Sequence, residues 1–274
     1  MKKRNYTKRQ MAVIILLSIG MIALSVTLNR LHPPDKKQKQ ETVTPGAVTT
    51  AVVSEETATP KPTPTIDPTE KIATFLQGPK SWGERRVWSG EWGDSYYDGG
   101  SFGGFGCGLC CMANIYTSLT PYECSPLDMY RYAQNKSGYG GGGAIDWGYI
   151  KETLKSAGFT CDVGRKPSSY ERFQKKVKSA LAMLVVVSSQ DSTCYWKDTP
   201  GHYVTLFLYD EKTDCIFLAD SGDPDHNRQW VSLKKIYRSL KTANNWQYLE
   251  VTKYEKSADT WRHHGYGGTC ILPD

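Results

Sequence analysis

The sequence predicts an α+β fold, in which helices come first along the chain and an antiparallel sheet follows. Two observations predict this order. Apolar residues recur at helical spacing in several early segments, whereas later segments are short apolar runs separated by polar turns. Segments of the first kind form helices and segments of the second kind form hairpins. Helices and strands that are segregated along the chain are typical of the α+β class.

The N-terminus is predicted to be a membrane anchor. Residues 1–10 carry five basic side chains, and residues 11–28 contain no charged side chain. An apolar run of this length is just long enough to span a bilayer, and its basic flank predicts that residues 1–10 form a cytoplasmic tail. A signal peptide that is cleaved, with secretion of the remainder, is the competing interpretation. Both interpretations place the rest of the chain outside the cell.

Residues 29–70 are predicted to form a disordered linker that is rich in Pro and Thr. They contain too few apolar side chains to offset the entropy of ordering. The alternating prolines of residues 57–65 favour an extended polyproline conformation. We therefore expect a semi-rigid spacer that holds an extracellular domain of residues 71–274 away from the membrane.

The charge distribution argues against nucleic acid as a partner. The formal net charge is +6, but residues 1–70 hold ten Lys or Arg against six Asp or Glu. The remaining residues hold 24 basic side chains against 22 acidic ones and contain no basic cluster. Residues 71–274 are enough to form a single catalytic core, and we expect the protein to be a monomer.

The first elements of the domain are expected between residues 71 and 119. Residues 71–76 form a short helix or strand. Residues 82–100 are aromatic and glycine-rich, and they either line a substrate groove or pack at the edge of the core. The glycine-rich residues before Cys107 hold no regular structure, and a helix begins at Cys107.

Further elements follow from periodicity and from capping residues. Helices are expected over residues 126–134 with Ser125 as the N-cap, over 145–156, over 169–181 and over 234–240. Strands are expected over residues 182–188, 203–209, 213–220, 230–233 and 245–254.

Cys107 is the candidate nucleophile because of its position at a helix start. The first N–H groups of a helix lack partners and the helix dipole favours an anion, so the pKa of this thiol is expected below the usual value of about 8.5. Gly106 and Gly108 flank Cys107 and would let a substrate backbone approach the sulfur. Such a thiolate is suited to nucleophilic catalysis if a base can reach it.

His202 is the candidate base, and Asp220 is the candidate residue that orients it. A hairpin that turns about residue 211 pairs positions whose numbers sum to 422, so His202 would face Asp220 with Cβ atoms roughly 4.5–5.5 Å apart. An error of one residue would send one side chain to the other face. If the pairing holds, Asp220 accepts a hydrogen bond from the imidazole and leaves the other ring nitrogen for Cys107.

Three segments carry a resemblance to a known family. In chain order they are Gly106-Cys107-Gly108-Leu109-Cys110-Cys111, Gly201-His202-Tyr203-Val204 and Ala219-Asp220-Ser221-Gly222. Over roughly residues 72–254, the chain resembles the papain-like C39-type cysteine peptidases. The resemblance implies a papain-like fold and cleavage of peptide bonds. It also implies that Cys107 is the nucleophile, His202 the general base and Asp220 the orienting acid. The best-known members of the family remove leader peptides from secreted peptides.

The sequence departs from the family pattern at one position. The family usually has a glutamine six residues before the nucleophile as an oxyanion donor, and Ser101 stands there in this chain. A serine hydroxyl is shorter and would reach less far. The sequence leaves open whether the backbone N–H of Cys107 supplies the donor, whether Tyr96, Tyr97 or Ser101 helps, or whether the activity is altered.

The remaining cysteines do not predict a metal or cofactor site. The chain has eight cysteines, and their spacing does not match that of zinc ligands. In an oxidising exterior, the seven cysteines other than the nucleophile allow at most three disulfides and one spare thiol. A bridge between Cys107 and Cys110 would block the nucleophile, and the pairing cannot be derived from the sequence.

Cys194 and Trp196 are expected near the mouth of the predicted site, whereas His226, His263 and His264 are interpreted as surface residues. The Asp and Asn residues at 223, 225 and 227 do not fit a helix-loop calcium site, because Arg228 and Lys234 stand where glycine and glutamate are needed.

The sequence therefore predicts a membrane-tethered extracellular cysteine peptidase that acts on a peptide or protein substrate through Cys107, His202 and Asp220. A papain-like cell-wall amidase and a transglutaminase-like acyl transferase share this order of residues and remain alternatives. A non-catalytic surface module that binds peptide or glycan through the aromatic stretch of residues 82–100 is the alternative from another class of protein.

Overall fold

The computed structural model describes residues 67–188, 195–197 and 199–274. They belong to one unit of the chain, Thr63–Asp274. The predicted tail, anchor and most of the predicted linker lie outside the described residues, so all three stay predictions. Among the residues that are described, no helix is long and apolar enough to cross a membrane.

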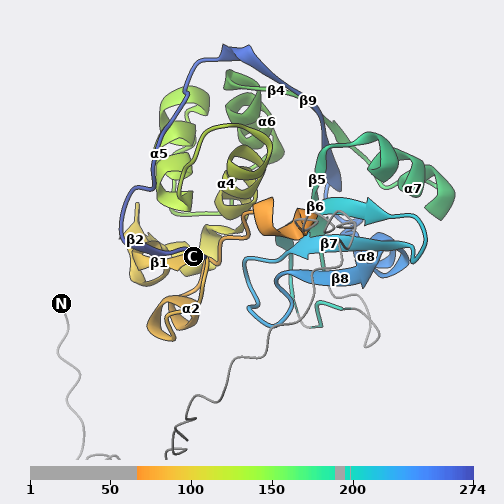
Figure 1. Ribbon diagram of the computed structural model, residues 1–274, viewed down its shortest axis with the longest axis horizontal. Coiled ribbons are helices and arrows are strands. Elements are labelled where there is room, and N and C mark those ends of the chain that lie inside the picture. Colours follow the sequence, from red (N-terminus) through yellow and green to blue (C-terminus); the bar gives the residue numbers. More distant parts are fainter. Residues whose placement is uncertain (1–66, 189–194, 198) are drawn as a thin grey trace, which may run out of the picture. The chain divides into compact units, whose positions relative to one another are not determined.

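A six-stranded antiparallel sheet forms the centre of the fold (Figure 1). Its spatial order is β4, β9, β5, β6, β7, β8, and each neighbouring pair is antiparallel. The strands are β4 (Ala157–Gly164), β5 (Ala182–Val187), β6 (His202–Asp210), β7 (Cys215–Ala219), β8 (Gln229–Ser232) and β9 (Tyr248–Asp259). Every residue of the apolar strand β5 is buried, as expected for a strand that is covered on both faces.

Three helices cover one face of the sheet. They are α4 (Cys107–Leu119), α5 (Pro126–Ser137) and α6 (Trp147–Ser156). Figure 1 shows α4 between α5 and the central strands, and Tyr203 and Phe207 of β6 share a hydrophobic core with all three helices. The first ten residues of α4 are buried, so this helix is the centre of the helical layer.

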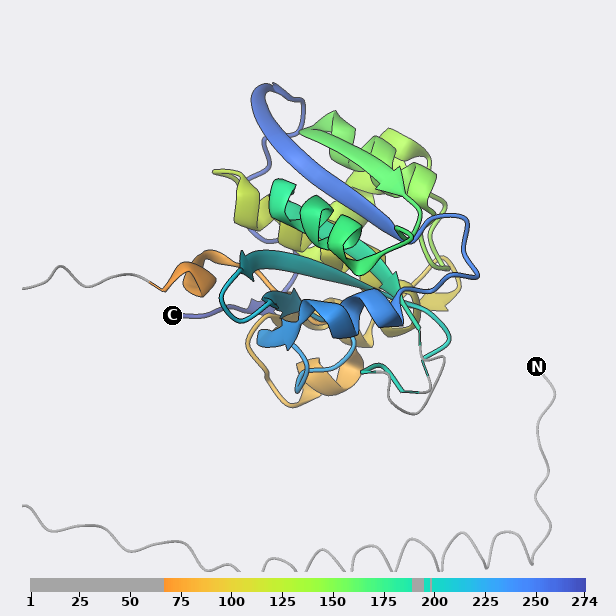
Figure 2. The same ribbon diagram turned by 90° about the vertical axis from the view of Figure 1, so that its right-hand side faces the viewer.

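Two helices cover the other face, α7 (Tyr170–Ser179) and α8 (Leu233–Ser239) (Figure 2). Phe173 of α7 and Ile236 of α8 pack with Val185 and Val204 of the sheet in a second hydrophobic cluster. The sheet therefore separates two cores. Mixed helices and an antiparallel sheet in this order confirm the α+β class.

The residues before α4 form a layer of short elements. These are η1 (Pro68–Lys71), α2 (Pro79–Gly83), β1 (Ser89–Gly90), η2 (Glu91–Asp94), β2 (Tyr96–Tyr97), β3 (Gly100–Ser101) and α3 (Phe102–Phe105), and β10 (Cys270–Ile271) pairs with β1. Trp88 and Trp92 are buried edge-on against Phe75. Most of the aromatic stretch therefore packs at the edge of the core, whereas Tyr96 is exposed.

Most predicted elements are confirmed, including the helix that begins at Cys107 and the helix that Ser125 caps. Two predictions before Cys107 are wrong. Residues 72–77 form neither helix nor strand, and α3 occupies a stretch for which no regular structure was expected. α3 forms because Phe102 and Phe105 are one helical turn apart and both reach the core. Strand β4 was not predicted at all.

The predicted register of the hairpin between β6 and β7 is also wrong, by two residues. The observed pairs are Thr205 with Ala219 and Leu206 with Leu218, and the ladder is interrupted after Phe207. Leu208 at the interruption has a positive φ of 48°. A bulge of this kind adds a residue to one strand, which hydrophobic alternation does not reveal.

Residues 72–77 are held by hydrogen bonds from individual partners, which explains their irregular backbone. The Ala73 N–H donates to Ser118 Oγ over 2.9 Å, and the Phe75 N–H donates to Asn114 Oδ1 over 2.7 Å. Both acceptors lie on α4. Since buried backbone donors need partners, these side chains replace the ladder that a strand would have supplied.

We expect Asn114→Ala to destabilise the domain. The substitution leaves the buried Phe75 N–H without its acceptor, which costs roughly 1–3 kcal/mol of unfolding free energy. Denaturant unfolding of the full chain measures this loss. Asn135→Ala, at an exposed position on α5, serves as the control and should change the unfolding free energy little. Equal effects of the two substitutions would contradict the assignment.

Candidate active site

Cys107 is the first residue of α4, and its sulfur lies at the N-terminal end of that helix. Among the described residues no side chain caps this end, so the positive end of the helix dipole acts on the sulfur. The thiol also accepts hydrogen bonds from the backbone N–H groups of Gly108 and Tyr203. A Cβ at Gly108 would lie 2.4 Å from Ile145 and 3.2 Å from the Tyr203 ring. The space beside Gly108 is thus occupied by protein, not left for substrate as the sequence had indicated.

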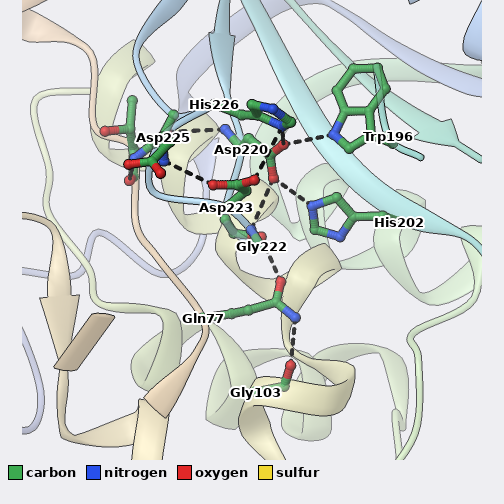
Figure 3. Close-up of polar contacts among 12 residues, drawn as sticks. Gln77, Gly103, Trp196, His202, Asp220, Gly222, Asp223, Asp225 and His226 are labelled. Carbon is green, nitrogen blue, oxygen red and sulfur yellow. Dashed lines mark hydrogen bonds and ion pairs between the residues drawn. The ribbon is translucent and has the colours of Figure 1, made fainter. Parts of the chain in front are cut away.

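Asp220 and His202 form a buried pair (Figure 3). His202 Nε2 lies 2.7 Å from Asp220 Oδ1. Asp220 is fully buried, and it accepts further hydrogen bonds from Trp196 Nε1 at 2.7 Å and from the Gly222 N–H at 2.9 Å. A buried carboxylate is tolerated when its oxygens are satisfied in this way.

The contact between His202 and Asp220 survives the two-residue error in the predicted register. A shift by an even number of residues keeps each side chain on its face of the sheet, so Asp220 becomes a diagonal neighbour of His202. Gly222 lies against the imidazole instead, where a Cβ would come within 2.9 Å of the ring. The missing side chain at Gly222 leaves room for the imidazole.

The pKa values of the three groups favour an ion pair between sulfur and imidazole. Burial alone would raise the pKa of Cys107, but hydrogen bonding to His202 and its charge lower that pKa below the ordinary value. Burial alone would lower the pKa of His202, but Asp220 and Cys107 raise it to about 10. Burial opposes ionisation of Asp220 as well, and its hydrogen bonds from His202 and Trp196 lower its pKa nevertheless.

Since Nε2 of His202 faces Asp220, Nδ1 is the ring nitrogen left for Cys107.

The neighbouring cysteines of α4 differ from Cys107. Burial raises the pKa of Cys110 and of Cys111 well above the ordinary value. All seven cysteines in the described part of the chain are free thiols, so Cys107 is not bridged to Cys110 there. Cys194 lies outside the described residues.

The three groups open into a cavity of about 650 Å³. Its lining includes Trp196, as the sequence predicted, and also His226. His226, which is interpreted from the sequence as a surface residue, is partly exposed and also lines this cavity. Its ring stacks on Tyr195 with centroids 4.0 Å apart, and its Nδ1 lies 3.8 Å from Asp220 Oδ2. His226 lies within the turn of residues 224–228, and the local sequence did not reveal that this turn places its ring beside Asp220.

Gln77 is a residue of the cavity that sequence reasoning missed. Its Nε2 donates to the Gly103 carbonyl over 2.8 Å, and its Oε1 accepts from Ser221 Oγ over 2.7 Å (Figure 3). Ser101, which stands where the resembled family has glutamine, is not among the residues that line the cavity. Gln77 precedes Cys107 by 30 residues in an irregular segment, so no motif or period pointed to it.

The described residues contain no group of three or more His, Cys, Asp or Glu that is arranged to hold a metal ion. The site consists of Cys107, His202 and Asp220 in a surface cavity of an α+β fold. It can supply a thiolate, a proton donor beside it and a buried carboxylate behind the donor.

Comparison with known proteins gives a structural likeness and no match to a family or a curated protein. Among solved structures, the chain is similar to the peptidase domain of Streptococcus ComA, a bi-functional ABC transporter involved in a quorum-sensing pathway. The TM-score is 0.37 and the sequence identity is 15%, over 53% of this chain and 90% of that domain.

We expect Asp220→Asn to shift the pH dependence of Cys107 alkylation. Without the carboxylate charge the pKa of His202 falls, the thiolate loses its cationic partner, and the pKa of Cys107 rises. The midpoint of the alkylation rate should move upward by roughly one to three pH units. Iodoacetamide labelling followed by mass spectrometry at Cys107 measures this midpoint.

Asp223→Asn is the matched control, because this carboxylate lines the same cavity but faces His226, with 3.5 Å between Asp223 Oδ2 and His226 Nδ1. Its midpoint should stay near that of the unmodified protein. An unchanged midpoint in Asp220→Asn would mean that Asp220 does not act on the thiol through His202.

Proposed function

We propose that the protein is a cysteine peptidase that cleaves a peptide or protein substrate through Cys107, His202 and Asp220. The observation that carries the proposal is the sulfur of Cys107 at a helix start, in hydrogen-bond contact with an imidazole that Asp220 keeps protonated. The pKa of this thiol is lowered while burial raises those of Cys110 and Cys111. A purely structural cysteine needs none of these contacts.

In the proposed reaction, the Cys107 thiolate attacks the carbonyl carbon of the scissile bond, and the carbonyl electron pair moves to the oxygen. His202 gives its proton from Nδ1 to the leaving amine as the C–N bond breaks, which leaves a thioester on Cys107. His202 then accepts a proton from water as the water attacks the thioester. The acid product leaves and the thiolate is restored. Asp220 stabilises the protonated imidazole and fixes its orientation.

The oxyanion would be stabilised by the backbone N–H of Cys107 and by Gln77. One N–H of the Gln77 amide is used by the Gly103 carbonyl, and the second is available to a substrate oxygen. Ser221 holds the other end of the amide, which keeps the group in place. Gln77 would thus supply the donor that the family places at the position of Ser101.

The proposed location is outside the cell, with residues 11–28 as a single membrane span and residues 1–10 in the cytoplasm. This part of the proposal rests on the uncharged run and its basic flank alone. Protease accessibility of residues 71–274 on intact cells tests this location. An exported domain would be digested, whereas a domain in the cytoplasm would be protected.

The peptidase activity is tested with the full chain, a pool of random-sequence peptides and an added small amine. We expect new peptide ends from hydrolysis, complete loss of these products in Cys107→Ala, and fast alkylation of Cys107 below the pH at which an ordinary thiol reacts. Cys215→Ala, which removes a partly exposed thiol on β7, should retain both.

Other outcomes of this experiment would identify the alternatives. Products that carry the added amine in place of a new acid end indicate an acyl transferase. Cleavage of cell-wall peptides, offered to the full chain in a parallel reaction, in the absence of cleavage in the pool indicates an amidase. Slow alkylation of Cys107 with no product indicates a binding module and would overturn the proposal.

We expect Gln77→Ala to lower kcat by about tenfold or more with little change in KM, because an oxyanion donor acts in the transition state. Alkylation of Cys107 by iodoacetamide forms no oxyanion, so its rate should be unchanged and shows that the site remains intact. Ser101→Ala should leave kcat near that of the unmodified protein. A larger loss in Ser101→Ala than in Gln77→Ala would reverse the assignment.

A further inference from the structure

A second cavity of about 480 Å³ lies next to the Cys107–His202 site. It is lined by Asp146 and Trp147 at the start of α6, by Tyr203 of β6 and by Trp246 in the segment before β9. The proposed reaction uses none of these side chains. Neither the resemblance to C39-type peptidases nor the proposed reaction assigns a role to the aromatic walls and the carboxylate of this cavity.

Tyr203 connects this cavity to the candidate nucleophile. The Tyr203 backbone N–H donates to the Cys107 sulfur, and its side chain lines the second cavity. His202, the preceding residue, lines the first cavity. Because consecutive side chains of a strand point to opposite faces, the two cavities lie on opposite sides of the β6 backbone beside Cys107. An extended peptide rises about 3.3 Å per residue, so side chains within a few residues of the scissile bond can reach either cavity.

Asp146 is the only charged residue among the described residues that line this cavity. Its side chain is exposed and makes no hydrogen bond or ion pair with another described residue, whereas its backbone carbonyl accepts from the Ile150 N–H. It occupies the N-cap position of α6, yet its side chain makes no capping hydrogen bond. An N-cap aspartate usually bonds to the first turn of its helix. Its carboxylate is therefore available to a ligand.

The walls of the cavity are suited to a long side chain with a cationic end. The rings of Trp147 and Tyr203 meet edge to face with centroids 4.9 Å apart. The Trp246 ring already carries a guanidinium, that of Arg165, 5.7 Å from its centroid. Aromatic faces attract cations and also pack against the methylene stem of Lys or Arg.

We infer that this second cavity binds a cationic side chain, of the lysine or arginine type, of the peptide that lies across Cys107. The inference rests on the proposed function in that it places the peptide there. Asp146 would pair with the cationic end and the aromatic rings would contact the stem. A neutral side chain of the same length would keep the second contact and lose the first.

The test uses two sets of peptides in which one residue at a time, at each of three positions on either side of the reactive centre, is lysine or its uncharged analogue norleucine. The first set carries a thiol-reactive electrophile, and its rate of inactivation of the full chain is measured. The second set is fluorescent and unreactive, and its binding to the Cys107→Ala protein is measured by polarisation. We expect lysine to be favoured about fivefold at one position in both sets.

Asp146→Asn should remove this preference and leave the norleucine peptides unaffected. Glu152→Gln, an exposed carboxylate on the same helix that does not line the cavity, is the matched control and should retain the preference. Equal values for lysine and norleucine at every position, or a preference that persists in Asp146→Asn, would overturn the inference. Binding that depends on Asp146 without any inactivation would keep the cavity assignment and reject the peptidase.

Discussion

The buried charge of Asp220 is the constraint on which the candidate site depends. The carboxylate is fully buried, so each of its oxygens must be satisfied by protein donors. Those donors come from the start of β6, from the segment that contains Trp196 and from the turn after β7. Displacing any one of them would leave a buried anion partly unpaired, which typically costs several kcal/mol. The same hydrogen bonds that satisfy Asp220 therefore fix the imidazole of His202 in the position from which it contacts Cys107.

The segment of residues 72–77 extends this constraint to the helical layer. Asn227 accepts a hydrogen bond from the Asp220 N–H and donates one to the Thr74 carbonyl. Gln77 bonds to Ser221, the residue after Asp220, while the Phe75 N–H donates to Asn114 of α4. The irregular segment thus ties the turn that holds Asp220 to the helix that begins with Cys107. The sulfur and the carboxylate belong to different layers of the fold, and these hydrogen bonds are what connect the two layers at the cavity.

The sequence predicted the parts of this site that follow from local rules. The helix start at Cys107 followed from glycine before it and helical spacing after it, and the approach of His202 to Asp220 followed from strand alternation. The register error did no harm at His202, because a shift of two residues is even and keeps each side chain on its face of the sheet. Gln77 and His226 could not be predicted, since each reaches the cavity from an irregular segment whose path is set by tertiary hydrogen bonds. Strand β4 was missed because it follows α6 directly and its outer residues are polar.

Burial raises the pKa of the cysteines of α4, whereas the contacts at the start of the helix lower it. Of these cysteines, Cys107 is the one whose pKa is lowered. Cys110 and Cys111 lie within four residues of Cys107 on the same helix, and burial holds both as thiols. Cys107 is nearly as buried, so burial by itself would hold it as a thiol too. Only the first residue of the helix has the free N–H groups and the protonated imidazole beside it, and these favour the anion by more than burial opposes it. A thiolate in this protein therefore requires the helix end, the imidazole and the buried carboxylate together, and α4 offers that combination at one position.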